Sequence, residues 1–222
     1  MKLYHFIQSS YGLNALEDGC IKVSRLDDMN DPFELYGVNI KDKELRRHFR
    51  SYKHKMAKKS FMLCCSMSWK SPLLWSHYAD RHKGIALVLE ADNSIIQKVT
   101  YQKSKIRIDE RKMIDTGMSP GSLALRLLTT KYEQWSYEEE ARIFINPDEI
   151  RYKNDLPFYD FDSQIRVTGL VLGPLCNLSR RQISESLNVG DNLRLTKARL
   201  GIQHFNVVKD KSYKYNVINK QA

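Results

Sequence analysis

Four short segments combine acids, hydroxyls, imidazoles and aromatic rings at a density that a packed core does not require. They are Asn30-Asp31-Pro32-Phe33-Glu34, Cys65-Ser66-Met67-Ser68, Trp75-Ser76-His77-Tyr78-Ala79-Asp80, and the stretch from Lys131 through Trp135 and Glu138-Glu139-Glu140 to Arg142. Carboxylates beside hydroxyls and imidazoles are the groups that acid and base catalysis uses. Because polar motifs that cluster in space indicate a site, we predict that Asn30 to Glu34, Trp75 to Tyr78 and Glu138 to Arg142 border one cleft. The residues predicted to line this cleft are Asn30, Asp31, Glu34, His77, Trp135 and Arg142.

The acidic run Glu138-Glu139-Glu140 has two interpretations. If the run is extended, Glu138 and Glu140 point to one face and Glu139 points to the other. Such an arrangement can serve catalysis, but together with Arg142 it also fits an exposed ion-pair ladder across a sheet. A buried Arg142 that holds one glutamate in place is compatible with both interpretations.

Several common chemistries lack their motifs. The ten glycines form neither a dinucleotide-binding nor a phosphate-binding loop, and no H-E-x-x-H sequence occurs. The four cysteines include one adjacent pair and no C-x-x-C, which indicates reduced, mostly buried thiols. A hydrolytic nuclease with Asp31, Glu34 and Glu138 around a divalent cation is a further interpretation, which no spacing supports. We therefore predict no metal site.

The order of the motifs resembles the bacterial and phage proteins grouped as domain of unknown function family 2971 (DUF2971). The shared features are an early Leu-Tyr strand, the Asn-Asp-Pro-Phe-Glu turn, a Cys-x-Ser strand, Trp-Ser-His-Tyr-Ala-Asp followed by Lys-Gly, and Trp-x-x-Glu-x-Glu-x-Arg. They occur in this order between Leu3 and Ile145. The resemblance implies one DUF2971-like domain over residues 1–222, but this family name carries no activity.

The layout also resembles ADP-ribosyltransferases, including the DNA-modifying branch of that superfamily. These folds carry a basic residue or His on the first strand, a Ser-x-Ser strand or a Tyr in the middle, and a Glu-x-Glu that opens a later strand. The matching positions here are His5, Ser66, Ser68, Tyr78, Glu138 and Glu140. The resemblance implies that NAD is the substrate, with the first four residues in its binding site and the two glutamates as catalytic residues.

The implied reaction gives each residue a role. Breaking the bond between nicotinamide and ribose builds positive charge on the ribose ring, which a fixed carboxylate stabilises in the transition state. We predict Glu140 for this role and Glu138 as the group that accepts the proton of an attacking nucleophile. His5 would hydrogen-bond the adenosine ribose, and Tyr78 would stack on the nicotinamide ring.

A basic segment stands apart from these motifs. Residues 41–59 hold nine basic and two acidic side chains, which supply +7 of the formal net charge of +10. Apolar residues recur there at steps of four, three and four, which predicts one docked helical face, formed by Leu45, Phe49, Tyr52 and Met56. The cations on the other faces fit either a solvated surface or nucleic-acid binding, with Arg46, Arg47, Arg50 and Lys53 as the contacts.

The elements that must position these residues include more strands than helices. Strands are expected at 2–7, 20–26, 61–67, 85–90, 99–101, 141–145, 167–172, 203–208 and 213–218, and helices at 10–17, 41–59, 73–79, 122–132, after Ser179 and from Asp191. Because the two kinds of element do not alternate, the pattern predicts an α+β fold with a mixed, largely antiparallel sheet. The ADP-ribosyltransferase resemblance implies that this sheet is split.

Composition and the first residues bear on location. A chain of 222 residues with 42% hydrophobic side chains fits one compact domain. Residues 1–8 lack the apolar stretch of a secretory signal, and no apolar run approaches the ~20 residues that a membrane helix needs. We therefore predict a cytoplasmic protein with no membrane partner.

Two functions are compatible with these observations. The first is an NAD-dependent ADP-ribosyltransferase-like enzyme that modifies a nucleic acid or a protein in phage–host conflict or a toxin system. The second is a non-enzymatic cytoplasmic module that binds nucleic acid or an acidic partner through the basic segment. His5, Tyr78 and Glu140 would line one cleft in the first case and lie scattered in the second.

Overall fold

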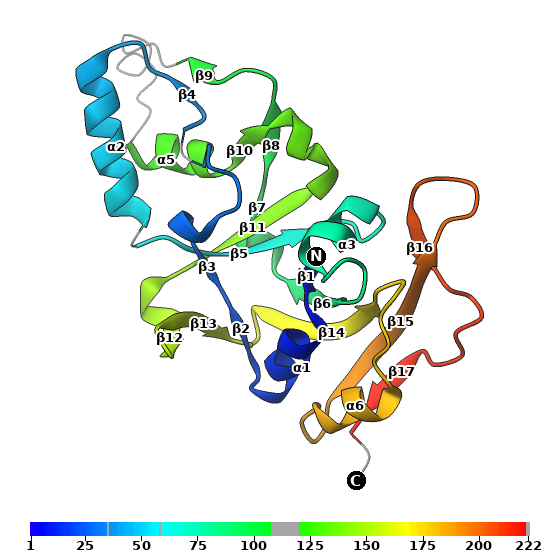
Figure 1. Ribbon diagram of the computed structural model, residues 1–222. Coiled ribbons are helices and arrows are strands. Elements are labelled where there is room, and N and C mark those ends of the chain that lie inside the picture. The colour runs from blue at the N-terminus through cyan, green and yellow to red at the C-terminus, as the bar shows by residue number, and fades with distance from the viewer. Residues whose placement is uncertain (35, 58, 108–119, 221–222) are drawn as a thin grey trace.

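A large mixed sheet forms the framework of the protein (Figure 1). The computed structural model describes residues 1–34, 36–57, 59–107 and 120–220. Within these residues the strands follow the order β16 (Val207–Lys209), β15 (Asn192–Leu200), β14 (Ile165–Leu172), β6 (Ile85–Ala91), β1 (Lys2–Ile7), β5 (Phe61–Ser66), β11 (Glu140–Ile145) and β7 (Ile96–Lys98). Strands β14 and β15 run parallel, and the other neighbours on this path run antiparallel. The predicted α+β class with a mixed, largely antiparallel sheet is confirmed.

Short strands and helices surround this sheet. Strand β17 (Val217–Asn219) pairs with β15, and β3 (Ser24–Arg25) pairs with β5. A three-stranded sheet consists of β12 (Ile150–Lys153), β13 (Leu156–Asp160) and β2 (Cys20–Lys22). Two-stranded sheets pair β10 (Thr130–Tyr132) with β8 (Thr100–Gln102) and β4 (Val38–Asn39) with β9 (Ile106–Arg107). Among the described residues, the α-helices are α1 (Ser9–Glu17), α2 (Lys43–Ala57), α3 (Pro72–Tyr78), α5 (Pro120–Leu128) and α6 (Arg180–Glu185). The 3-10 helices there are η1 (Leu26–Asp28), η2 (Asn93–Ile95), η3 (Glu133–Glu138) and η4 (Pro147–Glu149). Nowhere in the described ranges is a helix both long enough and apolar enough to cross a bilayer.

The large sheet is nearly interrupted between β1 and β5. Strand β1 pairs with β6 at six positions, from Lys2 with Glu90 to Ile7 with Ile85. Its pairing with β5 is reduced to the single position of Tyr4 with Ser66. One half of the sheet therefore runs from β16 to β1 and the other from β5 to β7, and the two strands at the junction diverge.

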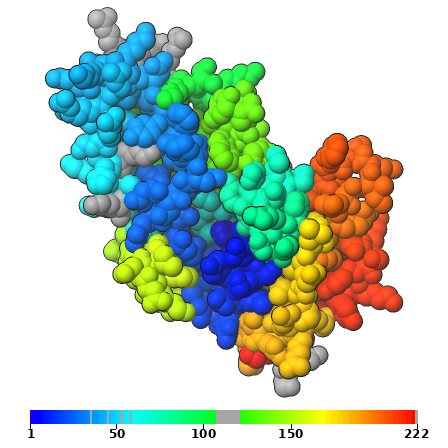
Figure 2. Space-filling view, viewed as in Figure 1, coloured from blue at the N-terminus to red at the C-terminus, as the bar shows by residue number. Residues whose placement is uncertain are grey.

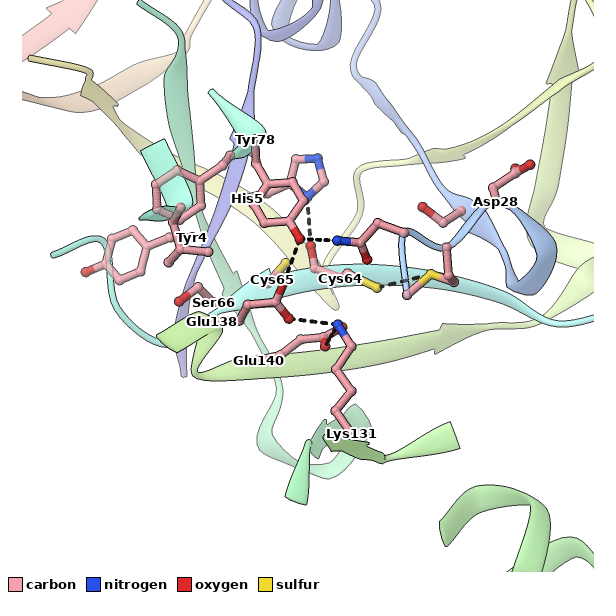
Figure 3. Close-up of a pocket in the computed structure, with 15 residues that line it drawn as sticks. Tyr4, His5, Asp28, Cys64, Cys65, Ser66, Tyr78, Lys131, Glu138 and Glu140 are labelled. Atoms are coloured by element: carbon pink, nitrogen blue, oxygen red, sulfur yellow. Dashed lines mark hydrogen bonds and ion pairs between the residues drawn. The ribbon is translucent and has the colours of Figure 1, made fainter. Parts of the chain in front are cut away.

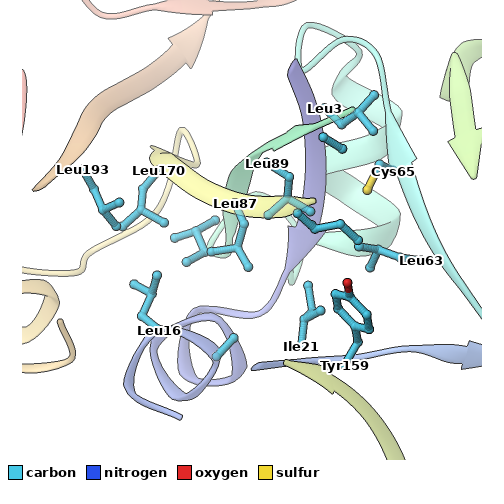
Figure 4. Packing of buried hydrophobic residues seen from close by; sticks show 14 of the residues in the cluster. Leu3, Leu16, Ile21, Leu63, Cys65, Leu87, Leu89, Tyr159, Leu170 and Leu193 are labelled. Atoms are coloured by element: carbon cyan, nitrogen blue, oxygen red, sulfur yellow. The ribbon is translucent and has the colours of Figure 1, made fainter. Parts of the chain in front are cut away.

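The main hydrophobic core lies on the face of the sheet that packs against α1, β2 and β13 (Figure 4). Leu3, Leu87 and Leu89 are fully buried there, and each such side chain stabilises the fold by on the order of 1.5–3 kcal/mol. A second cluster surrounds Trp75, whose ring meets Phe6 edge-on at a centroid distance of 4.9 Å. Because side chains alternate along a strand, β1 supplies Leu3 to one cluster and Phe6 to the other.

The basic segment forms helix α2, at the end of the molecule away from the C-terminal strands (Figure 1). Phe49 and Met56 are partly buried against a third apolar cluster that includes Leu26 and Met62. The predicted docked helix is therefore confirmed for these two anchors. The side chains of its other two predicted anchors, Leu45 and Tyr52, lie outside the described residues.

The helix expected over 122–132 is wrong for its last four residues. Helix α5 ends at Leu128, Thr129 forms a turn, and β10 begins at Thr130. The hydroxyls of Thr129 and Thr130 hydrogen-bond back to the carbonyls of Leu125 and Arg126, at 2.8 and 2.7 Å. Branching at Cβ and hydroxyls that satisfy the last carbonyls both favour ending a helix here.

The helix expected from Asp191 is also wrong, because this segment is strand β15. Leu193 and Leu195 are buried while Arg194 between them is exposed, which is the alternation of a strand with one buried face. Asp191 closes a turn instead of capping a helix, since its carboxylate accepts a hydrogen bond from the backbone N–H of Asn188 at 2.7 Å.

Three further strand predictions need correction. The strand expected over 20–26 is broken, because β2 pairs with β13 whereas β3 pairs with β5. The last two strands are shorter than the expected 203–208 and 213–218.

The acidic run is not extended as expected. Residues up to Glu138 form the 3-10 helix η3, and Glu139 adopts a left-handed conformation with φ of 43°. Strand β11 then begins at Glu140. This turn leaves Glu139 exposed, while Glu138 and Glu140 are both buried.

Candidate functional site

A cavity of about 210 Å³ lies where β1 and β5 diverge (Figure 3). At this point the strand register aligns Tyr4, Ser66 and Glu140 across three neighbouring strands, β1, β5 and β11. The predicted site residues that line the cavity are His5, Asn30, Ser66, Tyr78, Glu138 and Glu140. Residues from distant parts of the sequence therefore meet at one break in the sheet.

His5 spans this break. Its Nδ1 lies 2.9 Å from the carbonyl oxygen of Cys64 on β5, close to the point where backbone pairing between the strands stops. Because a carbonyl only accepts hydrogen bonds, Nδ1 carries the ring proton. Burial lowers the pKa of His5, although the bond to Cys64 acts against it. The ring is therefore neutral at pH 7, and Nε2 is left as an acceptor.

Helix α3 places Tyr78 over the cavity. The helix begins at Pro72 directly after Ser71, as the Ser-Pro signal predicts. Trp75 is fully buried and anchors it, with its indole N–H donating to the Trp69 carbonyl at 2.7 Å. Tyr78 follows Trp75 by three positions, at the last turn of the helix.

The Tyr78 hydroxyl connects two of the predicted motifs. It donates to Oε1 of Glu138 at 2.6 Å and accepts a hydrogen bond from the side-chain amide of Asn30 (Figure 3). Burial and the neighbouring Glu138 carboxylate raise the pKa of Tyr78. The hydroxyl therefore stays protonated and holds one oxygen of Glu138 in place.

Lys131 joins the two predicted catalytic carboxylates. Its Nζ lies 2.7 Å from Oε2 of Glu138 and 2.8 Å from Oε2 of Glu140. It reaches them from β10, on the side opposite His5 and Tyr78 (Figure 3). Glu138 and Glu140 thus face one cation despite the turn between them.

Arg142 binds the carboxylates of both Glu140 and Glu34. Its Nε lies 2.8 Å from Oε1 of Glu140, and its two terminal nitrogens bond both oxygens of Glu34, at 2.9 and 2.5 Å. The guanidinium also donates to the carbonyl of Leu128. Arg142 and Glu34 are fully buried, at 0% and 1% exposure. The ion pairs predicted for an exposed ladder are therefore internal.

Glu140 and Lys131 keep their charges at neutral pH. Burial acts to raise the pKa of Glu140, but Arg142 and Lys131 outweigh it and lower this pKa to about 2. Burial acts to lower the pKa of Lys131, but Glu140 and Glu138 outweigh it and raise this pKa. With Glu34, three carboxylates face two cations, so the cluster has a formal charge of −1.

Four other predicted residues lie next to the cavity rather than in its lining. Asp31 caps its own turn by accepting a hydrogen bond from the backbone of Phe33 at 2.9 Å. Ser68 lies in a turn whose backbone bonds the hydroxyl of Ser66. His77 is exposed, and its ring lies 6.1 Å from the ring of Tyr78.

Trp135 is the fourth of these residues. Its ring lies 5.2 Å from Nζ of Lys131, on the side of that lysine that faces a neighbouring cavity. Trp135 therefore lies beside Lys131 in the lining of the neighbouring cavity and not in the lining of the first.

The nuclease interpretation is not supported by this geometry. Glu34 is bound by Arg142 and Glu138 by Lys131, while Asp31 serves its own turn. Among the residues that the structure describes, no group of His, Cys, Asp and Glu side chains is arranged to hold a metal ion.

Sequence reasoning missed two members of the site. Lys131 is buried between carboxylates, yet it lies in a three-residue strand with no charge pattern that would indicate burial. The hydroxyl of Tyr101 accepts a hydrogen bond from the backbone N–H of Glu140 at 2.7 Å. Neither contact has a local signal, because both depend on the pairing of β8 with β10 and on the place of this pair beside the start of β11, where Val99 N–H donates to the Glu140 carbonyl at 2.9 Å.

The thiols in the cavity wall are poor nucleophiles. Cys64 and Cys65 line the cavity, and burial, followed by the Glu140 carboxylate, raises the pKa of both. The four cysteines of the chain are unbridged.

The predicted nucleic-acid contacts lie on α2, away from the cavity between β1 and β5. Arg46, Arg47 and Arg50 are exposed there, and Arg46 also donates to the carbonyls of Ile40 and Lys41. The side chain of Lys53 lies outside the described residues.

Comparisons with family models, curated proteins and solved structures find no match to this chain.

Proposed function

We propose that this protein is an NAD-dependent ADP-ribosyltransferase-like enzyme that acts on a macromolecule. The observation that supports it is that His5, Tyr78 and Glu140, from three distant parts of the chain, line one cavity. They lie around a break in the sheet, in agreement with the split sheet that the resemblance implies. The scattered arrangement expected of a purely structural set of residues is not observed.

The charge of the cluster suits the proposed reaction. When the bond between ribose C1′ and the nicotinamide nitrogen breaks, its electron pair leaves with nicotinamide and positive charge develops on the ribose. A buried cluster with a formal charge of −1 stabilises that charge without having to reorient. Glu140, fixed by Arg142 and Lys131, is the carboxylate that the proposal places against the ribose.

The remaining groups bind the substrate and complete the transfer. The nucleophile of the target forms a bond to C1′ and gives its proton to Glu138. Nε2 of His5 accepts a hydrogen bond from a ribose hydroxyl, and Ser66 lies beside it in the lining. The ring of Tyr78 stacks on nicotinamide.

The size of the cavity sets how much of NAD it encloses. Complete pockets for small molecules measure about 300–1,000 Å³. A cavity of about 210 Å³ therefore encloses the reacting part of the dinucleotide and leaves the rest at its rim.

The context of the proposed enzyme is phage–host conflict or a toxin system in the cytoplasm. Reducing conditions there keep thiols unpaired, which suits the four unbridged cysteines.

Labelled NAD tests the proposal. The protein is incubated with NAD labelled in its adenosine part and with separate DNA, RNA and protein pools, and released nicotinamide and labelled polymer are measured. Glu140→Gln keeps the shape of the side chain but removes its charge, so turnover should fall by at least about 100-fold, the loss seen when one oxyanion-stabilising donor is removed. Glu139→Gln is the matched control, because Glu139 is exposed.

Two results would contradict the proposal. One is equal NAD turnover in the two variants, and the other is no nicotinamide release by the wild-type protein with any pool. Melting temperatures of both variants show whether a loss of activity is a loss of folding.

A second candidate function has its own supporting observation. The exposed arginines of α2 fit a non-enzymatic module that binds nucleic acid or an acidic partner. This second function would be favoured if the protein binds such partners, if Glu140→Gln leaves that binding unchanged, and if no NAD is cleaved.

A further inference from the structure

A second cavity, of about 390 Å³, adjoins the first. Lys131 lines both cavities, and the turn from Asn30 to Phe33 separates them, with Asn30 in the lining of the first and Phe33 in that of the second. A molecule bound in the second cavity would therefore lie next to the carboxylates of the first.

The second cavity combines exposed aromatic rings with cations. Phe33 is 56% exposed and Tyr132 is 47% exposed, and both line it together with Trp135. Nζ of Lys105 lies 5.0 Å from the centre of the Phe33 ring, and Nζ of Lys131 lies 5.2 Å from that of Trp135. Exposed aromatic rings beside cations are the surfaces on which unpaired nucleobases stack.

A cationic path leads from this cavity to α2. A third cavity of about 180 Å³ shares Tyr36 and Lys105 with the second, and Arg46 and Arg50 of α2 line it. Helix α2 lies at the outer surface, on one side of the molecule (Figure 2). The aromatic rings therefore lie between the proposed reaction site and a surface that attracts phosphates.

We propose that the second cavity binds an unpaired base of a single-stranded nucleic acid whose backbone follows α2. This inference depends on the proposed function and names its target. A base in the duplex stack cannot reach these rings, so the target strand must be single or locally opened. A nucleophilic atom of the bound base attacks ribose C1′, the electron pair of the broken bond leaves with nicotinamide, and the proton of the nucleophile passes to Glu138.

Binding is tested without NAD, so that it does not depend on the proposed chemistry. Fluorescence anisotropy is measured with labelled single-stranded DNA, single-stranded RNA of the same sequence, and the corresponding duplex. Phe33→Ala and Tyr132→Ala should each weaken single-strand binding about five- to 100-fold, the usual effect of removing one stacking ring. Tyr11→Ala is the control, because Tyr11 is also an exposed aromatic residue, at 61%, but lies on α1.

The dependence of binding on salt tests the path along α2. Arg47→Gln and Arg50→Gln remove exposed charges, and each should lower the slope of log affinity against log salt by about 0.7, if it contacts one phosphate of a single strand. Arg46 is left unchanged, because it also bonds two backbone carbonyls. Circular dichroism checks that each variant is folded.

The possible outcomes separate the two proposals. The inference is supported if single-strand binding depends on Phe33 and Tyr132 and if the same strand is modified in the presence of NAD. The preferred strand, DNA or RNA, is then the target. Nicotinamide release with labelling of the protein pool alone, or strand binding that is equal in all variants, overturns it and leaves the proposed function intact. Weaker NAD affinity in Phe33→Ala with unchanged strand binding also overturns it, because the rings then serve the dinucleotide. Ring-dependent strand binding without any NAD cleavage contradicts the proposed function but not the base-binding cavity.

Discussion

The guanidinium of Arg142 bonds both carboxylate oxygens of Glu34, 108 positions earlier in the chain, and neither side chain reaches solvent. A buried charge that loses its partner is strongly destabilising, because its remaining interactions do not compensate for the hydration free energy lost on burial. The pair therefore ties the turn at Glu34 to strand β11, and with it the whole charge cluster.

Glu34→Gln is expected to lower the free energy of unfolding by about 1–3 kcal/mol, since the amide accepts only one of the two hydrogen bonds from Arg142, which keeps Glu140 as its charged partner. Urea unfolding measures the change. Glu185→Gln is the matched control, because the Arg181–Glu185 pair is exposed and its loss should change stability little. Similar stability for the two variants would mean that the buried pair does not hold the fold together.

His5 should make stability depend on pH. Its pKa in the folded protein is lowered below the ordinary value of 6.5, so the unfolded chain binds the proton more readily. The stabilisation is complete above pH 6.5 and is lost as the pH falls through the folded pKa. Glu140, whose pKa is lowered to about 2, acts in a separate range below its ordinary value of 4.5.

The variant His5→Asn isolates this effect. Asparagine still presents an N–H to the Cys64 carbonyl but has no titrating group. The free energy of unfolding, measured from pH 7.5 to 5 in about half-unit steps, should fall more steeply in the wild-type protein than in the variant. Parallel curves would show that His5 does not titrate differently in the folded state.

Two changes at Tyr78 separate its ring from its hydroxyl. Tyr78→Phe keeps the ring, so NAD affinity should change less than in Tyr78→Leu, which loses the stacking surface. Both variants leave an oxygen of Glu138 without its 2.6 Å hydrogen bond and should lose about 1–2 kcal/mol of stability, because the site is partly exposed. Calorimetric titration with NAD and urea unfolding measure the two quantities. Equal NAD affinities in the two variants would exclude stacking on the ring.

Glu139 has a backbone conformation that glycine adopts more readily than other residues. Its φ of 43° lies in the left-handed region, which is unfavourable for residues with a Cβ by about 1–2 kcal/mol. Glu139→Gly should therefore be more stable than Glu139→Ala, by about 1 kcal/mol. Thermal unfolding compares the two, and a more stable alanine variant would contradict the observed turn.

Local patterns predicted the elements whose own residues determine them. Strand β1 was expected with the bounds that it has, and the apolar spacing of α2 identified Phe49 and Met56 as anchors. The end of α5 at Thr129 was missed although its cause is local, the hydroxyls of Thr129 and Thr130 bonding carbonyls four residues earlier. The turn at Glu139 was missed because distant residues fix both sides of it, Tyr78 at Glu138 and Tyr101 at Glu140.

The site was predictable in part. The sequence indicated the glutamates, His5 and Tyr78 by residue type and order. It did not indicate Lys131, because a lysine is buried only when carboxylates from elsewhere in the chain surround it. The inward position of Arg142 likewise depends on Glu34, which no local pattern connects to it.

The single paired position between β1 and β5 also bears on the order of folding. Each half of the sheet has continuous pairing of its own, whereas the cavity exists only after the two halves have met. The junction gains little backbone pairing when it forms, because β1 and β5 pair at one position whereas β1 and β6, and β5 and β11, pair at six. We therefore expect the junction to be unformed in the transition state for folding, so that changes such as Glu34→Gln accelerate unfolding and leave the rate of folding almost unchanged. The part of the protein proposed to carry out the reaction would then be the last to assemble and the first to open.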